Sequence, residues 1–149
     1  MKVLLIEDEP HKNSDLMAAI GRVFGKKAEV TLCKAVKDGY MAAFEREFDV
    51  VILDMALPTF PEDGDAAGLA QASGGMEIVR LLAKRRVSSK VIIVTQYPEV
   101  IINNTIVKLS ELSEYVSSRY GLPLSGCVLY SFDDAGWQVK LMGILEAAK

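Results

Sequence analysis

The feature that most constrains the fold of this chain is an alternation of short, almost purely apolar runs with segments of helical period. The apolar runs are rich in Val, Ile and Leu and occupy residues 2–8, 29–35, 49–55, 90–96 and 126–132. Such short runs are typical of strands buried on both faces, which occur in parallel sheets covered by helices. The sequence therefore predicts an α/β fold built on a doubly wound, five-stranded parallel sheet.

Helical spacing of apolar residues predicts five helices, at residues 11–24, 38–47, 75–86, 103–120 and 134–148. The fourth is expected to be extended, running from about residue 103 to residue 120, where Gly121 follows and ends it. A loop insertion at about 58–75, rich in Pro, Gly and Ala, is longer than most connections in a compact domain. It is interpreted as a lid or as a partner-binding insertion.

Composition limits the classes of function. The 149 residues fit one domain, residues 1–149. The apolar runs are far shorter than the roughly 20 residues of a membrane span, and the run before Glu7 is too short for a signal peptide. We therefore expect a cytoplasmic protein with no membrane partner. The net charge is −3 and basic residues are scattered, which argues against direct binding of nucleic acid. Cys33 and Cys127 lack metal-ligand spacing and are expected to be small buried hydrophobes.

Acidic residues follow the ends of two predicted strands. Glu7 and Asp8 close the first strand, and Asp54 closes the third. Parallel strands end along one edge of a sheet, and in the simplest two-way winding these two strands are neighbours. Carboxylates that lie so close repel one another unless one takes a proton or a divalent cation lies between them. Magnesium suits such a site because it takes oxygen ligands from carboxylates and phosphates.

With a metal bound, Asp54 is suited to accept a phosphoryl group as a nucleophile, because the ion neutralises charge on the transferring oxygens. Thr95 closes the fourth strand, where its hydroxyl can donate to a phosphoryl oxygen. The arrival of phosphate would then pull on that strand, which is a two-state switch in outline. The plainer interpretation is that acids at strand ends serve only solubility or loop capping.

Three segments together resemble the receiver domains of two-component response regulators. VLLIEDEP (3–10) is similar to the first strand of the family, VVILDMALP (50–58) to its phosphoacceptor strand and VIIVTQY (91–97) to its switch strand. Gly75 resembles the glycine at the start of the family's third helix. The resemblance implies a flavodoxin-like fold with strand order 2-1-3-4-5. It also implies a signalling domain rather than an enzyme, which receives phosphate from a histidine kinase or a phosphotransfer protein.

The resemblance also assigns roles by position. It implies that Asp54 is the phosphoacceptor and Thr95 the switch hydroxyl. It further implies that Mg²⁺ is held by four groups, which are the side chains of Glu7, Asp8 and Asp54 and the backbone carbonyl of Ala56.

The sequence departs from the family pattern where the fifth strand ends. Tyr130 replaces a lysine that bridges to the acceptor, and Ser131 replaces the usual proline. A phenol donates one neutral hydrogen bond but cannot supply the charge that favours a doubly anionic product. Lys34, after the second strand, is a distant substitute. Gln96 stands where a small residue usually follows the switch threonine, and Cys127 stands at the position of the switch aromatic.

Two functions from different classes stay open. One is a phosphoacceptor that switches a face formed by the fourth helix and fifth strand toward an unknown downstream protein. The other is a degenerate pseudo-receiver, which is a phosphorylation-independent interaction module. An enzyme with a flavin or nucleotide is disfavoured because no glycine-rich phosphate loop follows a strand. A homodimer also stays open, and if nothing follows residue 149 the effect must come through a partner.

Overall fold

The computed structural model describes residues 1–57 and 74–149. Its centre is a parallel sheet of five strands in the order β2-β1-β3-β4-β7. These strands are β1 (Lys2–Ile6), β2 (Glu29–Cys33), β3 (Val50–Leu53), β4 (Lys90–Thr95) and β7 (Leu124–Leu129). The predicted fold class and strand order are confirmed, with β7 as the fifth strand of the sheet. The loop predicted at 58–75 lies outside the described residues except for its last two positions.

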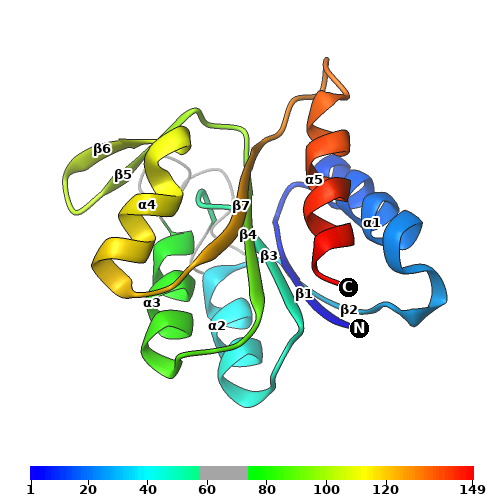
Figure 1. Cartoon of the computed structure of the whole chain (residues 1–149), viewed down its shortest axis with the longest axis horizontal. Helices are drawn as coiled ribbons and strands as arrows, with labels where there is room; N and C mark the ends of the chain where they lie inside the picture. Colours follow the sequence, from blue (N-terminus) through cyan, green and yellow to red (C-terminus); the bar gives the residue numbers. More distant parts are fainter. Residues whose placement is uncertain (58–73) are drawn as a thin grey trace.

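Helices cover both faces of the sheet (Figure 1). On one face lie α1 (Pro10–Phe24) and α5 (Gly136–Ala147), and on the other lie α2 (Val36–Glu45), α3 (Gly75–Arg85) and α4 (Leu109–Tyr120). A short 3-10 helix, Gly25–Lys27, follows α1. Within residues 1–57 and 74–149, none of the helices has the length and apolarity needed to cross a membrane.

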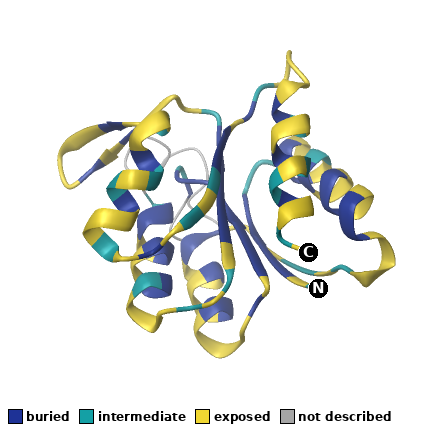
Figure 2. Ribbon diagram, in the orientation of Figure 1, coloured by how far each residue is buried: buried dark blue, intermediate teal, exposed yellow. Residues whose placement is uncertain are grey.

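The sheet separates two apolar clusters because successive side chains of a strand point to opposite faces. In β1, Leu4 and Ile6 belong to the cluster under α2, α3 and α4, whereas Val3 and Leu5 belong to the cluster under α1 and α5. Figure 2 shows the central strands buried along their length, while the helices are buried on their inner sides. The sheet is therefore covered on both faces, as the nearly continuous apolar runs predicted.

The two cysteines lie on opposite edges of the sheet. Cys33 ends β2 and Cys127 lies in β7, and both are buried free thiols. Burial raises the pKa of both thiols above the ordinary value. A raised pKa keeps a cysteine in its unreactive thiol form, so both act as the small buried hydrophobes that were expected.

The prediction that an extended fourth helix begins at about residue 103 was wrong, because α4 begins at Leu109. A hairpin of two antiparallel strands, β5 (Glu99–Ile102) and β6 (Thr105–Lys108), precedes α4. Asn103 and Asn104 form its turn with φ angles of 51° and 61°. Asparagine tolerates this left-handed conformation, which tight two-residue hairpin turns require and which a right-handed helix cannot contain.

Gly75, the first residue of α3, lies against the end of β3. Its N–H donates to the carbonyl of Met55 at 2.9 Å. A Cβ at this position would overlap the carbonyl oxygen of Asp54 and lie 2.9 Å from the Cα of Met55. Only glycine therefore allows α3 to begin this close to the backbone that carries Asp54.

We predict that Gly75→Ala lowers the free energy of unfolding by about 1–3 kcal/mol, the usual cost of overpacking. Gly21→Ala is the matched control, because Gly21 is exposed within α1 and no atom lies within 4 Å of an added Cβ. That substitution should raise stability by about 0.5–1 kcal/mol. Urea denaturation measures both variants, and equal effects would show that the close contact at Gly75 is unimportant.

Candidate functional site

Three residues form a row across the sheet at the carboxyl ends of β1, β3 and β4, one position beyond the last paired residues that these strands share. They are Glu7, Asp54 and Val94. The N–H of Asp54 donates to the carbonyl of Ile6 at 3.2 Å, which extends the pairing of β1 with β3. The acids of the first and third strands therefore lie on neighbouring strands, as their positions in the sequence predicted.

The side chain that joins this row is Lys12, from the first turn of α1. Its ammonium donates to Asp54 Oδ2 at 2.9 Å and to the carbonyl of Val94 at 2.8 Å, and it forms an ion pair with Glu7 Oε2. These three partners match the three protons of an ammonium group. The Lys12 side chain is completely buried, so its charge depends on these partners rather than on water.

The local sequence directs Lys12 toward the strand ends. Pro10 is the first residue of α1, and the carboxylate of Glu9 caps the helix by accepting the backbone N–H groups of His11 and Lys12. Helical side chains tilt toward the helix amino terminus, so a long side chain in the first turn reaches back over the preceding loop. Glu9 therefore fixes the position from which Lys12 reaches Asp54.

The Glu7 carboxylate is almost completely buried, with 1% of the residue exposed. Its Oε1 accepts the N–H groups of Asp8 at 3.1 Å and Glu9 at 3.0 Å. Burial raises the pKa of Glu7 to about 8, against the charge of Lys12, and the charge of Asp54 adds to the rise. Burial also raises the pKa of Asp8. Burial therefore disfavours the charged forms of both acids, and the ammonium of Lys12 offsets only part of this effect at Glu7.

The predicted acceptor and switch residues lie at the ends of adjacent strands. Asp54 is 6% exposed, and its Oδ1 accepts the N–H of Ala56 at 3.2 Å. Thr95 ends β4 and is completely buried. Its Oγ1 accepts the N–H of Tyr97 at 3.3 Å, and its carbonyl accepts the N–H of Tyr130 at 2.8 Å. The hydroxyl of Thr95 thus participates in the turn that follows β4.

Tyr130 is buried directly after β7, but its hydroxyl is directed to α1. It donates to Asp15 Oδ2 at 2.6 Å and lies 3.2 Å from His11 Nδ1. Its ring centroid lies 5.7 Å from Lys12 Nζ and 4.8 Å from the ring of Trp137. Burial, together with the hydrogen bond to Asp15, raises the pKa of the phenol. Tyr130 is therefore a neutral group beside the ammonium of Lys12.

Lys12 is the residue of the candidate site that sequence analysis missed. Lys34, the substitute considered there, is exposed and follows the edge strand β2. A signal for Lys12 was nevertheless present, because it shares the buried face of α1 with Leu16, Ile20 and Val23 at helical spacing. A lysine on the apolar face of a helix needs a buried partner, and strand-end carboxylates supply one.

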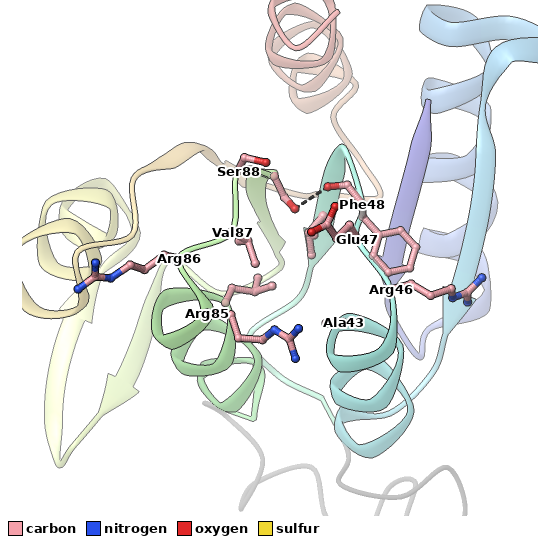
Figure 3. Close-up of a pocket in the computed structure, with 11 residues that line it drawn as sticks. Ala43, Arg46, Glu47, Phe48, Arg85, Arg86, Val87 and Ser88 are labelled. Carbon is pink, nitrogen blue, oxygen red and sulfur yellow. Dashed lines mark hydrogen bonds between the residues drawn. The ribbon is translucent and has the colours of Figure 1, made fainter.

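A hollow between α2 and α3 lies away from this site. It is a cavity of about 200 Å³ at the opposite, amino-terminal edge of the sheet (Figure 3). In Figure 3 the side chains of Arg46 and Arg86 point away from it, whereas that of Arg85 lies between the two helices. None of the predicted site residues lines this cavity. The candidate site is therefore a group of mostly buried strand-end side chains that lies apart from this cavity.

The acidic residues fit a divalent cation in charge and donor type. Carboxylate oxygens are the ligands that Mg²⁺ prefers. Burial is the main cause of the raised pKa values of Glu7 and Asp8, and the nearby charge of Asp54 adds to both. Among residues 1–57 and 74–149, however, no three acidic, His or Cys side chains form a ready-made metal cluster. Lys12 already occupies oxygens of Glu7 and Asp54. A metal would have to share these carboxylates with the ammonium.

Comparison with known proteins identifies the family. No protein-family model matches the chain. Its sequence is 30% identical over 148 residues to the Detocs response regulatory protein DtcB of Vibrio alginolyticus, covering 97% of this chain and 99% of that protein. The chain belongs to the response regulator receiver family. The family resemblance drawn from the three sequence segments is thereby confirmed.

Further similarities agree with this receiver assignment. DtcB of Enterobacter cloacae is 24% identical over 152 residues, covering 95% of this chain and 96% of that protein. Response regulator TrrA of Thermotoga maritima, solved in complex with Mg(2+)-BeF, superimposes with a TM-score of 0.60 at 19% identity. That match covers 96% of this chain and 97% of TrrA. At this identity the structural match shows the shared receiver fold.

We predict that Lys12→Met lowers the free energy of unfolding by about 3–5 kcal/mol at about pH 8, because Glu7 and Asp54 lose their buried cation. The loss should be smaller at about pH 5, because burial raises the pKa of Glu7 and this carboxylate can then take a proton once the ammonium is gone. Urea denaturation measures both values. Lys34→Met, which removes an exposed lysine, should change stability by less than about 0.5 kcal/mol. A Lys12→Met deficit independent of pH would contradict the charge-pairing explanation.

The raised pKa of Glu7 predicts that stability falls as the pH rises. The ordinary value is 4.5 and the folded value is about 8, so the folded state binds this proton more tightly. The contribution is therefore complete below pH 4.5 and is lost as the pH rises through about 8. Urea denaturation across this range in EDTA should show the decline. Glu7→Gln should flatten it, and an unchanged slope in that variant would assign the titration to another group.

Proposed function

We propose that this receiver accepts a phosphoryl group on Asp54 with Mg²⁺ bound and switches a protein-interaction face in phosphorelay signalling. The observation that carries the proposal is the contact between Asp54 Oδ2 and the buried ammonium of Lys12 at 2.9 Å. The absence of a fifth-strand lysine argued against phosphorylation because the site lacked a positive charge. Lys12 supplies that charge from α1, beside the acidic pair.

The proposed transfer uses a histidine kinase or a phosphotransfer protein as donor. A carboxylate oxygen of Asp54 forms the new O–P bond while the P–N bond of the donor's phosphohistidine breaks. The electron pair of the broken bond stays on the imidazole nitrogen, which takes a proton. Glu7, Asp8, Asp54 and the carbonyl of Ala56 would hold Mg²⁺, which supplies positive charge to the transferring oxygens. The names of the relatives and the Mg(2+)-BeF complex of TrrA support this assignment.

Thr95 would connect the acceptor to the interaction face. Its Oγ1 accepts the N–H of Tyr97, so a turn of the hydroxyl toward a phosphoryl oxygen would disturb that bond. Tyr97 is 52% exposed and precedes the hairpin formed by β5 and β6. In that hairpin Ile101 pairs with Ile106, and both are more than half exposed. Exposed apolar side chains of this kind suit contact with a downstream protein.

The proposal also covers the location of the protein in the cell and its partners. We assign it to the cytoplasm, with a donor kinase or phosphotransfer protein and a downstream protein as partners and no direct contact with nucleic acid. Its own chemistry would be limited to self-phosphorylation and dephosphorylation.

A pseudo-receiver is the second function, and Lys12 also favours it. The ammonium neutralises Asp54 without a metal, and Asp54 is only 6% exposed. In that case the ion pair would stabilise one conformation, and the exposed side of the β5–β6 hairpin would be available to a partner without phosphorylation. The two functions differ in whether Asp54 reacts.

We predict that Mg²⁺ with beryllofluoride shifts the amide NMR signals around Asp54, Thr95 and the β5–β6 hairpin. A small phosphodonor should add one base-labile phosphoryl group, visible by intact-protein mass spectrometry. Asp54→Asn should abolish both effects because it removes the nucleophile. Asp133→Asn, which changes an exposed aspartate after β7, is the matched control and should retain both. Failure of the unaltered protein to respond at millimolar Mg²⁺ would favour the pseudo-receiver.

A further inference from the structure

We propose that Lys12 is the residue that pairs with the phosphoryl group of Asp54, and that Glu7 is its positioning residue. The cation at the acceptor would thus come from α1 instead of the fifth strand. This inference rests on the proposed phosphoacceptor function and specifies which side chain stabilises its product. Tyr130, at the position expected for a lysine, then serves a different purpose.

The contact geometry supports Lys12 as the pairing residue. Its Nζ already touches the Asp54 carboxylate at 2.9 Å, so phosphoryl oxygens formed on that carboxylate would lie next to the ammonium. Hydrogen bonds between an ammonium and an anionic oxygen are about twice as strong as neutral ones. Tyr130 makes its hydroxyl bonds to Asp15 and His11 instead. Lys12 is thus the described cation best placed to stabilise a doubly negative product.

The three present partners of Lys12 indicate which contact it would give up when a phosphoryl group is added to Asp54. An added phosphoryl group needs one of the three ammonium protons, and the weakest acceptor among the present partners is the neutral carbonyl of Val94. Releasing that carbonyl would free the residue directly before Thr95 in β4. The pairing lysine and the switch threonine would therefore act on adjacent residues of one strand.

Glu7 is suited to hold Lys12 during this exchange. Its Oε2 contacts the ammonium, while its Oε1 is fixed by the N–H groups of Asp8 and Glu9. The carboxylate is thus anchored to the backbone on one side and to the lysine on the other. The side chain of Lys12 can change partners at Asp54 and Val94 while the Glu7 contact stays in place.

Tyr130 complements Lys12 in the same space. Its ring centroid lies 5.7 Å from Nζ, and its hydroxyl is bound to Asp15 of α1. A second ammonium entering from β7 at this position would face the charge of Lys12, whereas a neutral ring can cover it. We infer that Lys12 on α1 takes the place of the family's fifth-strand lysine, and that Tyr130 after β7 is the neutral side chain that fits beside it.

The test is a titration of the full chain with beryllofluoride at saturating MgCl₂, followed by ¹⁹F NMR and amide shifts. Lys12→Met should weaken beryllofluoride binding by at least about tenfold, as expected for loss of a charge-assisted hydrogen bond. Lys34→Met is the matched control, because it removes an exposed lysine after β2, and it should stay within about twofold. Circular dichroism establishes that each variant is folded.

A second variant addresses the instability expected of Lys12→Met. Glu7→Gln with Lys12→Met removes both partners of the ion pair, so it should recover stability. Its reference is Glu7→Gln, which loses the same proposed Mg²⁺ ligand, and the double variant should bind beryllofluoride more weakly than that reference. Glu7→Gln alone retains the ammonium at Asp54 and should lose less affinity than the double variant. Lys12→Met with Tyr130→Lys returns a cation from the fifth strand and should regain part of the lost affinity, which a purely structural role of Lys12 would not produce.

The outcomes separate this inference from the proposed function. If the unaltered chain fails to bind beryllofluoride with Mg²⁺, both are overturned. If it binds, and the folded Lys12 variants bind equally well, only the role of Lys12 is overturned and Asp54 remains a phosphoacceptor. Weak binding by the Lys12 variants together with rescue by the fifth-strand lysine would support the inference.

Discussion

One buried ammonium joins the ends of three neighbouring strands. Lys12 contacts Glu7 after β1, Asp54 after β3 and the carbonyl of Val94 in β4. Buried carboxylates are costly without a cation, and Lys12 is the cation that pairs with Glu7 and Asp54 among the described residues. The docking of α1 is therefore a requirement of the candidate site as well as of the core, because that helix carries Lys12, which pairs with Glu7 and Asp54.

The main sheet could be predicted because each strand is a nearly continuous apolar run separated from the next by a helical segment. That alternation leaves few arrangements, and the crossover rule selects among them. The hairpin before α4 could not be separated from a helix in the same way. Ile106 fits the helical spacing of Leu109 and Leu112 as well as it fits a short strand. The left-handed conformation of Asn103 and Asn104 forms the turn of the hairpin, and two adjacent asparagines are typical of such a turn.

The candidate site was predictable only in part. The positions of Glu7, Asp8, Asp54 and Thr95 follow from where apolar runs end, since the side chain after a parallel strand lies at the ligand-binding edge. The position of Lys12 depends on how α1 packs and on how far a lysine reaches, and neither is encoded by spacing alone. For the same reason, the bond of the Tyr130 hydroxyl could not be deduced from its place after the fifth strand.

The helix that delivers the cation begins directly after the acidic pair, with Glu9 as its cap. Both signs of charge at the acceptor thus come from a contiguous stretch, residues 7–12, together with Asp54. The lysine of the site therefore comes from α1 and not from the end of β7. Tyr130, which follows β7, contacts Asp15 of α1 and Trp137 of α5 and so joins these two helices. A short amino-terminal segment thereby supplies both the acidic pair and the lysine that contacts Asp54.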